Sequence, residues 1–151
     1  MSIEGAYLFQ GVGKDTMKQI LEVASEEEHA AGTFLFHAGD PADYLYILGA
    51  GRVRLRTGEP GYVAYVFSEP GEAIGWSSMV EHEKYSSSAE CIVPVKVTKI
   101  RKIALLPLLE KDAPSGAIFF RHLASIIGRR LVNCYKATVS VHGERDPHSY
   151  G

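Results

Sequence analysis

Cysteine is scarce in this sequence, and its scarcity excludes a scaffold held together by disulfides. Only Cys91 and Cys134 occur among the 151 residues, and both have apolar neighbours in the sequence. We expect two reduced thiols packed against other side chains, because two cysteines are too few to cross-link a small fold. A chain of this length buries enough apolar surface to fold as one domain without a disulfide or a metal.

Long hydrophobic runs and a strong net charge are also absent. No segment approaches the roughly 18 consecutive apolar residues that a membrane span requires, and the chain does not start with the basic and apolar stretches of a signal peptide. The net charge of −2 provides no overall attraction to nucleic acid or to an anionic membrane. These features predict a cytoplasmic protein with no membrane partner.

Sequence patterns typical of catalysis and of metal binding are missing as well. The chain has no Gly-x-Ser-x-Gly elbow, no Walker loop and no paired cysteine and histidine. The six histidines lack metal-ligand spacing, and His37, for example, is followed by alanine and glycine. We therefore predict no catalytic residue, no metal site and no enzymatic activity. A metalloenzyme of the cupin type, another β-barrel class, is the weak alternative.

Hydrophobic periodicity divides the chain into a helical start, a β-rich middle and a helical end. Residues 1–31 form the first part. In residues 32–101, short strands that often alternate between apolar and polar positions are separated by glycine- and proline-rich turns. Helical spacing returns in residues 102–142, and residues 143–151 form a frayed tail. We predict a single, mainly β domain with flanking helices, whose strands form a sandwich or a closed barrel.

Turn residues and helix caps indicate the individual elements. We expect Asp15 to cap the first helix, the charged run at 26–28 to form a solvated turn, and Ser115 to cap a long amphipathic helix at 116–142. In the strand at 52–56, the arginines favour an outward polar face over phosphate contacts. The predicted strands are at residues 33–36, 44–48, 52–56, 62–67, 87–93 and 95–100.

A glycine-containing turn, an apolar strand and a second glycine follow one another early in the β-rich part. The turn is Gly39-Asp40, the small residue Ala42 comes next, and the apolar run at 45–48 leads to Gly51. Glycine allows positive φ at both turns, and the apolar run suits a buried strand. This order resembles the first signature of the cyclic-nucleotide-binding domain family. The resemblance implies a double-stranded β-helix (jelly-roll) barrel plus a long C-terminal helix.

A second segment, residues 71–89, resembles the phosphate-binding cassette of the same family. It begins with the pair Gly71 and Glu72, and in the family this glutamate bonds the ribose hydroxyl. Backbone N–H groups of a glycine-rich turn and a short helix can hold a cyclic phosphate, as at other anion sites. Trp76 could stack on a base, although a lone tryptophan is more often part of a core. The ligand-binding residues implied are Gly71, Glu72, Ala73, Gly75, Trp76, Ser77, Ser87, Ser88 and Ala89.

One position departs from the family cassette: Ser87 stands where the family has its phosphate-binding arginine. A charge-assisted hydrogen bond contributes roughly 1.5–3 kcal/mol, against about 1 kcal/mol for a neutral one. Three interpretations follow. Lys84 or His82 supplies the charge, or the pocket takes a different small ligand, or the domain keeps the fold without a ligand. Cyclic AMP and cyclic GMP are candidate ligands, and no cofactor is certain.

Apolar residues recur along the 116–142 helix, and in the family the matching helix pairs two protomers. We predict a homodimer through this helix, with a monomer whose helix covers its own barrel as the alternative. Arg129 and Arg130 also lie in the helix, but only roughly ten residues follow it, so we expect no helix-turn-helix and no direct DNA binding. The apolar stripe consists of Phe120, Leu123, Ile127, Leu131, Cys134 and Val141, widened by Phe119, Ile126 and Val132.

These observations together predict a stand-alone small-molecule sensor or regulatory domain. Because the chain has no output domain of its own, the sensor is expected to act on a protein partner when ligand binding shifts the last helix. A degenerate, ligand-free domain that uses the same fold for protein contacts is the alternative.

Overall fold

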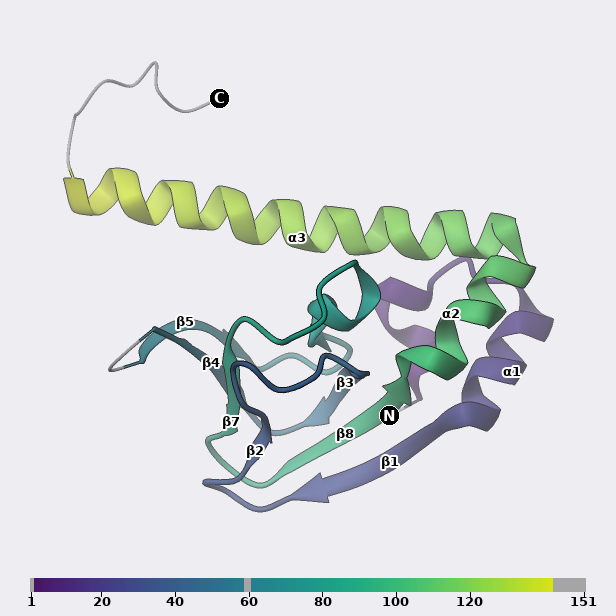
Figure 1. The fold of residues 1–151 in the computed structure, drawn as a ribbon, viewed down its shortest axis with the longest axis horizontal. Coiled ribbons are helices and arrows are strands. Elements are labelled where there is room, and N and C mark those ends of the chain that lie inside the picture. Colours follow the sequence, from purple (N-terminus) through teal and green to yellow (C-terminus); the bar gives the residue numbers. More distant parts are fainter. Residues whose placement is uncertain (1, 59–60, 143–151) are drawn as a thin grey trace.

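In the computed structural model, which describes residues 2–58 and 61–142, two β-sheets pack face to face, with several helical segments at one end and one long helix lying across the sheets (Figure 1). The strands within these residues are β1 (Ala24–His29), β2 (Phe34–Phe36), β3 (Tyr44–Ala50), β4 (Val53–Thr57), β5 (Tyr62–Phe67), β6 (Ala73–Ile74), β7 (Ser88–Cys91) and β8 (Val95–Arg101). They form two antiparallel four-stranded sheets, ordered β1-β8-β3-β6 and β2-β7-β4-β5. The predicted jelly roll is confirmed, as two packed sheets that do not close into one barrel.

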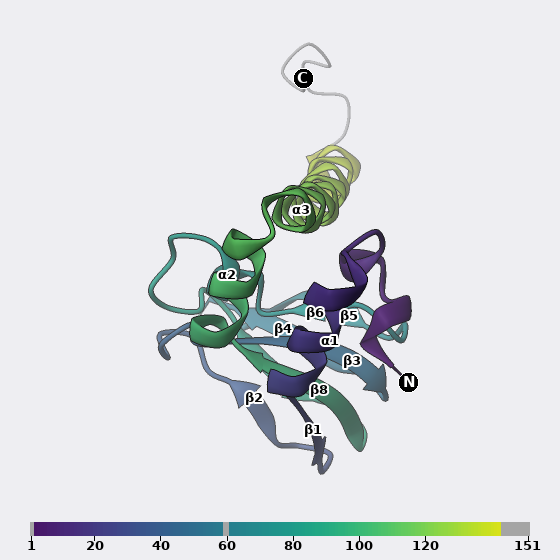
Figure 2. The same cartoon turned by 90° about the vertical axis from the view of Figure 1, so that its right-hand side faces the viewer.

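Helical segments lie before, within and after the sheets. They are η1 (Ile3–Gly5), η2 (Tyr7–Phe9), α1 (Lys14–Val23), η3 (Trp76–Met79), α2 (Lys102–Lys111) and α3 (Ala113–His142). Viewed along α3, the N-terminal turns and α2 lie on opposite sides beneath it (Figure 2). None of the described helices is both long and apolar enough to cross a membrane. The predicted tail at 143–151 lies outside the described residues.

The charged run at 26–28, expected as a solvated turn, lies in strand β1, so that expectation is wrong. The strand pairs antiparallel with β8 along its whole length. Lysines on β8 face the glutamates: Lys99 Nζ is 3.4 Å from Glu27 Oε1, and Lys96 Nζ is 3.5 Å from Glu28 Oε1. Opposite charges across paired strands favour the sheet. The negative charges of β1 are therefore balanced by lysines on β8, a strand about 70 residues away in the sequence.

Both predicted helix caps are replaced by other residues. Helix α1 starts after Gly13 rather than with Asp15 as its cap, and the Gly13 N–H donates to the Ser115 hydroxyl at 2.8 Å. Ser115 itself lies inside the first turn of α3. Its N–H donates to Asp112 Oδ1 at 3.4 Å, and the Thr16 hydroxyl donates to Asp112 Oδ2 at 2.7 Å. The Ser115 hydroxyl also donates to Asp112 Oδ2, and the hydrogen bonds from the Ser115 and Thr16 hydroxyls lower the pKa of Asp112. Asp112 thus links the start of α3 to α1.

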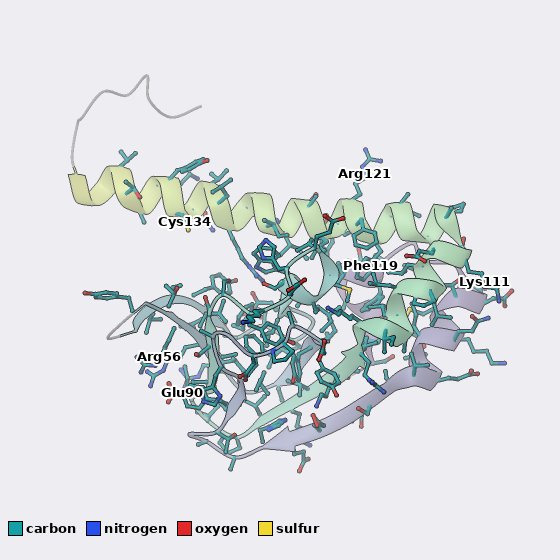
Figure 3. The ribbon with its side chains drawn as sticks, in the orientation of Figure 1. Arg56, Glu90, Lys111, Phe119, Arg121 and Cys134 are labelled. Atoms are coloured by element: carbon teal, nitrogen blue, oxygen red, sulfur yellow. The ribbon has the colours of Figure 1, made fainter. Side chains whose placement is uncertain are left out.

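The arginines on β4 are tied to the neighbouring strand β7. Arg54 Nε and Arg56 Nε donate to the same oxygen, Glu90 Oε1, at 2.7 and 2.9 Å, and Figure 3 shows Arg56 beside Glu90. The hydrogen bonds from Arg54 and Arg56 lower the pKa of the Glu90 carboxyl. The two guanidinium groups therefore already have an anionic partner, as an outward polar face predicts.

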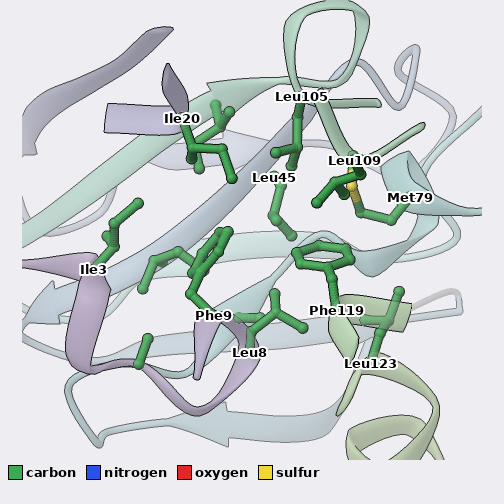
Figure 4. Packing of buried hydrophobic residues seen from close by; sticks show 14 of the residues in the cluster. Ile3, Leu8, Phe9, Ile20, Leu45, Met79, Leu105, Leu109, Phe119 and Leu123 are labelled. Carbon is green, nitrogen blue, oxygen red and sulfur yellow. The ribbon is translucent and has the colours of Figure 1, made fainter. Parts of the chain in front are cut away.

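Buried side chains form two clusters. One fills the space between the two sheets and includes Cys91. The other joins the helices to the β1-β8-β3-β6 sheet (Figure 4). In it, the rings of Phe9 and Phe119 lie 5.5 Å apart, so the start of α3 is fixed against the N-terminal turns. Other members shown in the figure are Ile3, Leu8, Ile20, Leu45, Met79, Leu105, Leu109 and Leu123.

Helix α3 is buried only near its start. Phe119 and Leu123 are fully buried, and Ile126 and Ile127 are half-buried. Cys134 is exposed, so the expectation of a packed thiol is wrong for this residue and right for Cys91. Apolar neighbours in the sequence do not bury a side chain when no other part of the described chain covers that stretch of helix. The side chain of Val141 lies outside the described residues. The large apolar residues of α3 that are 39–49% exposed are Leu131, Val132, Tyr135 and Val139.

Candidate functional site

The predicted cassette lies at the end of the sandwich that α3 covers. Its fold depends on Gly75, which precedes η3 with a φ of 86°. A Cβ atom at this position would lie 3.1 Å from the Tyr44 carbonyl oxygen and 3.2 Å from the ring of Tyr85. Glycine is therefore needed here both for its backbone conformation and for the close approach of its neighbours.

Glu72, the predicted ribose ligand, is engaged within the protein. Its Oε2 accepts the backbone N–H groups of Ser68 at 2.9 Å and Glu69 at 3.0 Å. Its Oε1 accepts the Tyr65 hydroxyl at 2.5 Å. Burial, followed by this hydrogen bond, raises the pKa of Tyr65. The carboxylate thus closes the turn between β5 and β6.

An arginine that the cassette resemblance does not include reaches this site from α3. The Arg130 guanidinium lies 4.8 Å from the ring centroids of both Tyr65 and Phe67, and its Nη2 donates to the Ala73 carbonyl at 3.1 Å. Burial lowers the pKa of Arg130, while the nearby Tyr65 and Glu72 act in the opposite direction. Within the described residues, no carboxylate forms an ion pair with it.

Arg130 borders two cavities of very different size. The larger, about 340 Å³, lies between the N-terminal turns, the loop at 70–73 and α3. The smaller, about 40 Å³, lies on the cassette side, beside Ser87. Sites for small molecules typically measure about 300–1,000 Å³. In this conformation only the larger of the two is of that size.

The predicted ligand residues divide between these cavities. Ser88 and Ala89 line neither: the Ser88 hydroxyl accepts the Ala38 N–H at 2.9 Å, and Ala89 is fully buried between the sheets. Trp76 is half-buried, packs against the helical core and borders the smaller cavity, and its stacking on a base stays a prediction. The larger cavity is lined by Gly71, Glu72 and Ala73, and the smaller by Gly75, Trp76, Ser77 and Ser87.

The two residues considered as substitutes for the missing arginine do not reach these cavities. Lys84 and His82 are exposed in the loop that follows η3 and line neither cavity. The His82 ring lies instead 5.4 Å from that of Trp76. The positive charge at the site comes from α3. Helical periodicity carries a signal for it, because Arg130 falls four residues after the half-buried Ile126 and so shares its face.

Tyr85 lines the smaller cavity, and its hydroxyl makes two hydrogen bonds to the backbone of Tyr44. The Tyr85 hydroxyl donates to the Tyr44 carbonyl at 2.6 Å and accepts the Tyr44 N–H at 3.1 Å. Its ring stacks on Phe36, with the centroids 3.7 Å apart. Burial raises the pKa of Tyr85 to about 12. Within residues 2–58 and 61–142, no three His, Cys, Asp or Glu side chains are placed to hold a metal ion.

Alkaline pH should destabilise the fold through Tyr85. An unfolded tyrosine ionises near pH 10, whereas folded Tyr85 keeps its proton to about pH 12. The unfolded state therefore binds fewer protons in this window, and the free energy of unfolding falls as pH rises, by roughly 2–3 kcal/mol for this residue. Tyr85→Phe should flatten the decline and remove one late transition from the ultraviolet titration of tyrosinate. An equally steep decline in the variant would contradict this. Tyr62→Phe controls for the loss of an exposed hydroxyl.

Comparison with known proteins agrees with the fold. The sequence model of the cyclic nucleotide-binding domain matches residues 26–112, more than half of the chain. The chain belongs to the cyclic nucleotide-binding domain family. It is 27% identical over 133 residues to the cyclic AMP receptor protein of Thermus thermophilus, covering 85% of this chain and 59% of that protein. The chain thus spans about three fifths of this curated relative.

Solved structures of this domain family have the same architecture. A cyclic nucleotide-binding domain from Methylobacillus flagellatus superposes with a TM-score of 0.79 at 19% identity, covering 95% of this chain and 82% of that one. The sensor domain of the transcriptional regulator DNR from Pseudomonas aeruginosa gives a TM-score of 0.73 at 20% identity, with 85% and 88% covered. At this identity the likeness is one of fold alone.

Proposed function

We propose that this domain is a small-molecule sensor with a regulatory rather than a catalytic role. A ligand binds between the sandwich and α3 and changes the position of α3. The observation that supports this most is the larger cavity, because it is lined both by the cassette loop and by Ile126, Arg129, Arg130 and Asn133 of α3. A ligand that touches both parts can bind two positions of the helix with different affinity, which is the requirement for a sensor.

Cyclic AMP and cyclic GMP are the first ligands to test. The family supports this class, and the Thermus thermophilus relative carries cyclic AMP in its name. Because Ser87 stands in the place of the cassette arginine, other small ligands remain candidates. The competing proposal is a ligand-free domain that binds a protein partner, and the exposed apolar residues of α3 favour it.

We further infer that two copies of the chain pair through the outer part of α3. Leu131, Val132, Tyr135 and Val139 are each at least 39% exposed on this helix. Apolar side chains gathered on one stretch of surface are typical of an interface. A second copy presents the same stretch, so a two-fold dimer would cover both at once. A cytoplasmic location and a protein partner for output complete the proposal.

A label on Cys134 tests the sensor and the dimer together. This thiol is exposed on α3 while Cys91 is buried, so a nitroxide reagent should modify Cys134 alone. We expect pulsed electron resonance to detect dipolar coupling between the two labels of a dimer. Saturating cyclic AMP or cyclic GMP should then shift the distance distribution by several ångströms.

Two results would contradict these proposals. An unchanged distance distribution, with ligand binding established by calorimetry, would show that α3 does not respond to the ligand. A single species of monomer mass in sedimentation of the unlabelled protein would refute the dimer, and it controls for disruption of the interface by the label.

A further inference from the structure

The larger cavity contains two guanidinium groups from successive residues of α3. Arg130 enters it over Tyr65, and Arg129 lies 5.1 Å from the centroid of the Tyr7 ring on the other side. Of the residues that line the cavity, these two are positively charged and Glu72 alone is negatively charged. The lining therefore has a net positive charge on its helical side.

Most of the hydrogen-bond donors on these guanidinium groups are unused within the described residues. An arginine has five N–H groups. Arg130 gives one to the Ala73 carbonyl, and the Arg129 Nε gives one to the Ser125 carbonyl at 3.4 Å. Glu72 accepts from neither arginine; its oxygens take the Tyr65 hydroxyl and two backbone N–H groups. A partly buried guanidinium with free donors and no carboxylate partner is suited to bind an oxyanion from outside the chain.

The cassette itself provides little of this chemistry. Ser87, which stands at the position of the missing arginine, offers only a neutral hydroxyl, and the cavity beside it is about 40 Å³. That volume is smaller than small-molecule sites typically require. Arg130 also occupies one wall of this cavity. Arg130 thus supplies positive charge to both cavities, but of these two only the larger one, on the α3 side of Glu72, has the space for a small-molecule anion.

We propose that Arg130, assisted by Arg129, binds the phosphate of a phosphate-bearing small molecule in the larger cavity, so that α3 replaces the cassette as the phosphate-binding element. This proposal rests on the proposed sensor function and specifies its ligand class. The Arg130 guanidinium, 4.8 Å from the ring centroids of Tyr65 and Phe67, donates its free N–H groups to the phosphate oxygens. The phosphate then attracts α3 directly, without a cassette residue between them.

The test measures binding by calorimetry to the full chain and to three variants. The probes are cyclic AMP, cyclic GMP, inorganic phosphate, and adenosine, which has no phosphate. Arg130→Gln should weaken binding of the cyclic nucleotides at least tenfold, since a charge-assisted contact is replaced by a neutral one. Arg129→Gln should weaken it less, because Arg129 is more exposed. Adenosine should bind the wild type and Arg130→Gln equally.

The matched control is Arg121→Gln. Arg121 lies on the same helix, is exposed, points away from the sandwich in Figure 3 and lines neither cavity. This variant should bind each probe within twofold of the wild type. Thermal unfolding of the wild type and all three variants distinguishes a loss of affinity from a loss of folding.

Each outcome decides between the proposals. A tenfold loss confined to the phosphate-bearing probes supports the role of Arg130, and saturable binding of inorganic phosphate alone would place the recognition in the phosphate itself. Equal nucleotide affinities for wild type and Arg130→Gln would overturn the role of Arg130 while the sensor function stands. No binding of any phosphate-bearing probe at millimolar concentration would overturn the ligand class. The sensor function would then be tested by measuring the Cys134 label distances with neutral ligands.

Discussion

Replacing Gly51 by alanine should lower the free energy of unfolding by about 3–5 kcal/mol. Gly51 has a φ of 97°, a left-handed conformation that costs alanine roughly 1–2 kcal/mol. A Cβ atom there would also meet the Pro94 carbonyl oxygen and lie 2.9 Å from the Val95 side chain. The Pro94 oxygen belongs to the backbone immediately before β8, so it cannot move aside without disturbing the sheet.

Gly32→Ala is the control for the backbone part of this effect. Gly32 has a similar φ of 86°, but no atom lies within 4 Å of the added Cβ. Its substitution should therefore cost only about 1–2 kcal/mol. Urea unfolding of both variants measures the difference. If the two variants lose the same stability, the contact with the strand β8 backbone is not the reason that position 51 requires glycine.

Phe119→Ala should also cost about 3–5 kcal/mol, because it removes a fully buried ring from the cluster that holds α3. The ring packs on Phe9 and reaches the sheet between α2 and the N-terminal turns (Figure 4). The cavity left behind lies between elements that are distant in the sequence, so it can close only if α3 moves. Guanidinium or urea unfolding, followed by circular dichroism, measures the loss.

The adjacent Phe120 provides the comparison for this prediction. It has the same side chain on the same helix but is 37% exposed, and its ring meets that of Phe119 edge-on at 5.1 Å. Phe120→Ala should cost about 1 kcal/mol, near the typical value for a point substitution. A larger loss for Phe120 than for Phe119 would mean that α3 docks on the sandwich by a different face.

The sequence predicts the strands of this fold well wherever apolar side chains mark them. Strand β5 has the predicted bounds, and β3, β4 and β8 lie within two residues of them. The two missed strands lack that mark. In β1 the side chains that face β8 are largely charged, and β6 is only Ala73–Ile74, too short to show a period. Both segments become strands because they pair with a strand distant in the sequence, and local periodicity carries no information about that pairing.

The site shows the same limit. The cassette resemblance groups Gly71, Glu72 and Gly75, and the structure has them close together because they are close in sequence; their role in ligand binding stays a prediction. The resemblance does not include Tyr65, whose hydroxyl engages Glu72, or Arg130, which arrives from α3. Both join the site only through the folded arrangement of sheet and helix. The spacing along the cassette therefore predicts the shape of the loop and not the charges around it.

Because α3 is buried only near its start and is exposed from Leu131 onward, it can act as a lever. The buried pair Phe119 and Leu123 is the pivot, and Arg130 is the point where a ligand would pull. At a rise of about 1.5 Å per residue, Arg130 lies about 10 Å from Leu123 and His142 about 28 Å from it. A tilt that moves Arg130 by about 1 Å would therefore move the far end of the helix by about 3 Å. The exposed residues from Leu131 onward lie on this long arm, where a small motion at the ligand becomes a larger one at the surface.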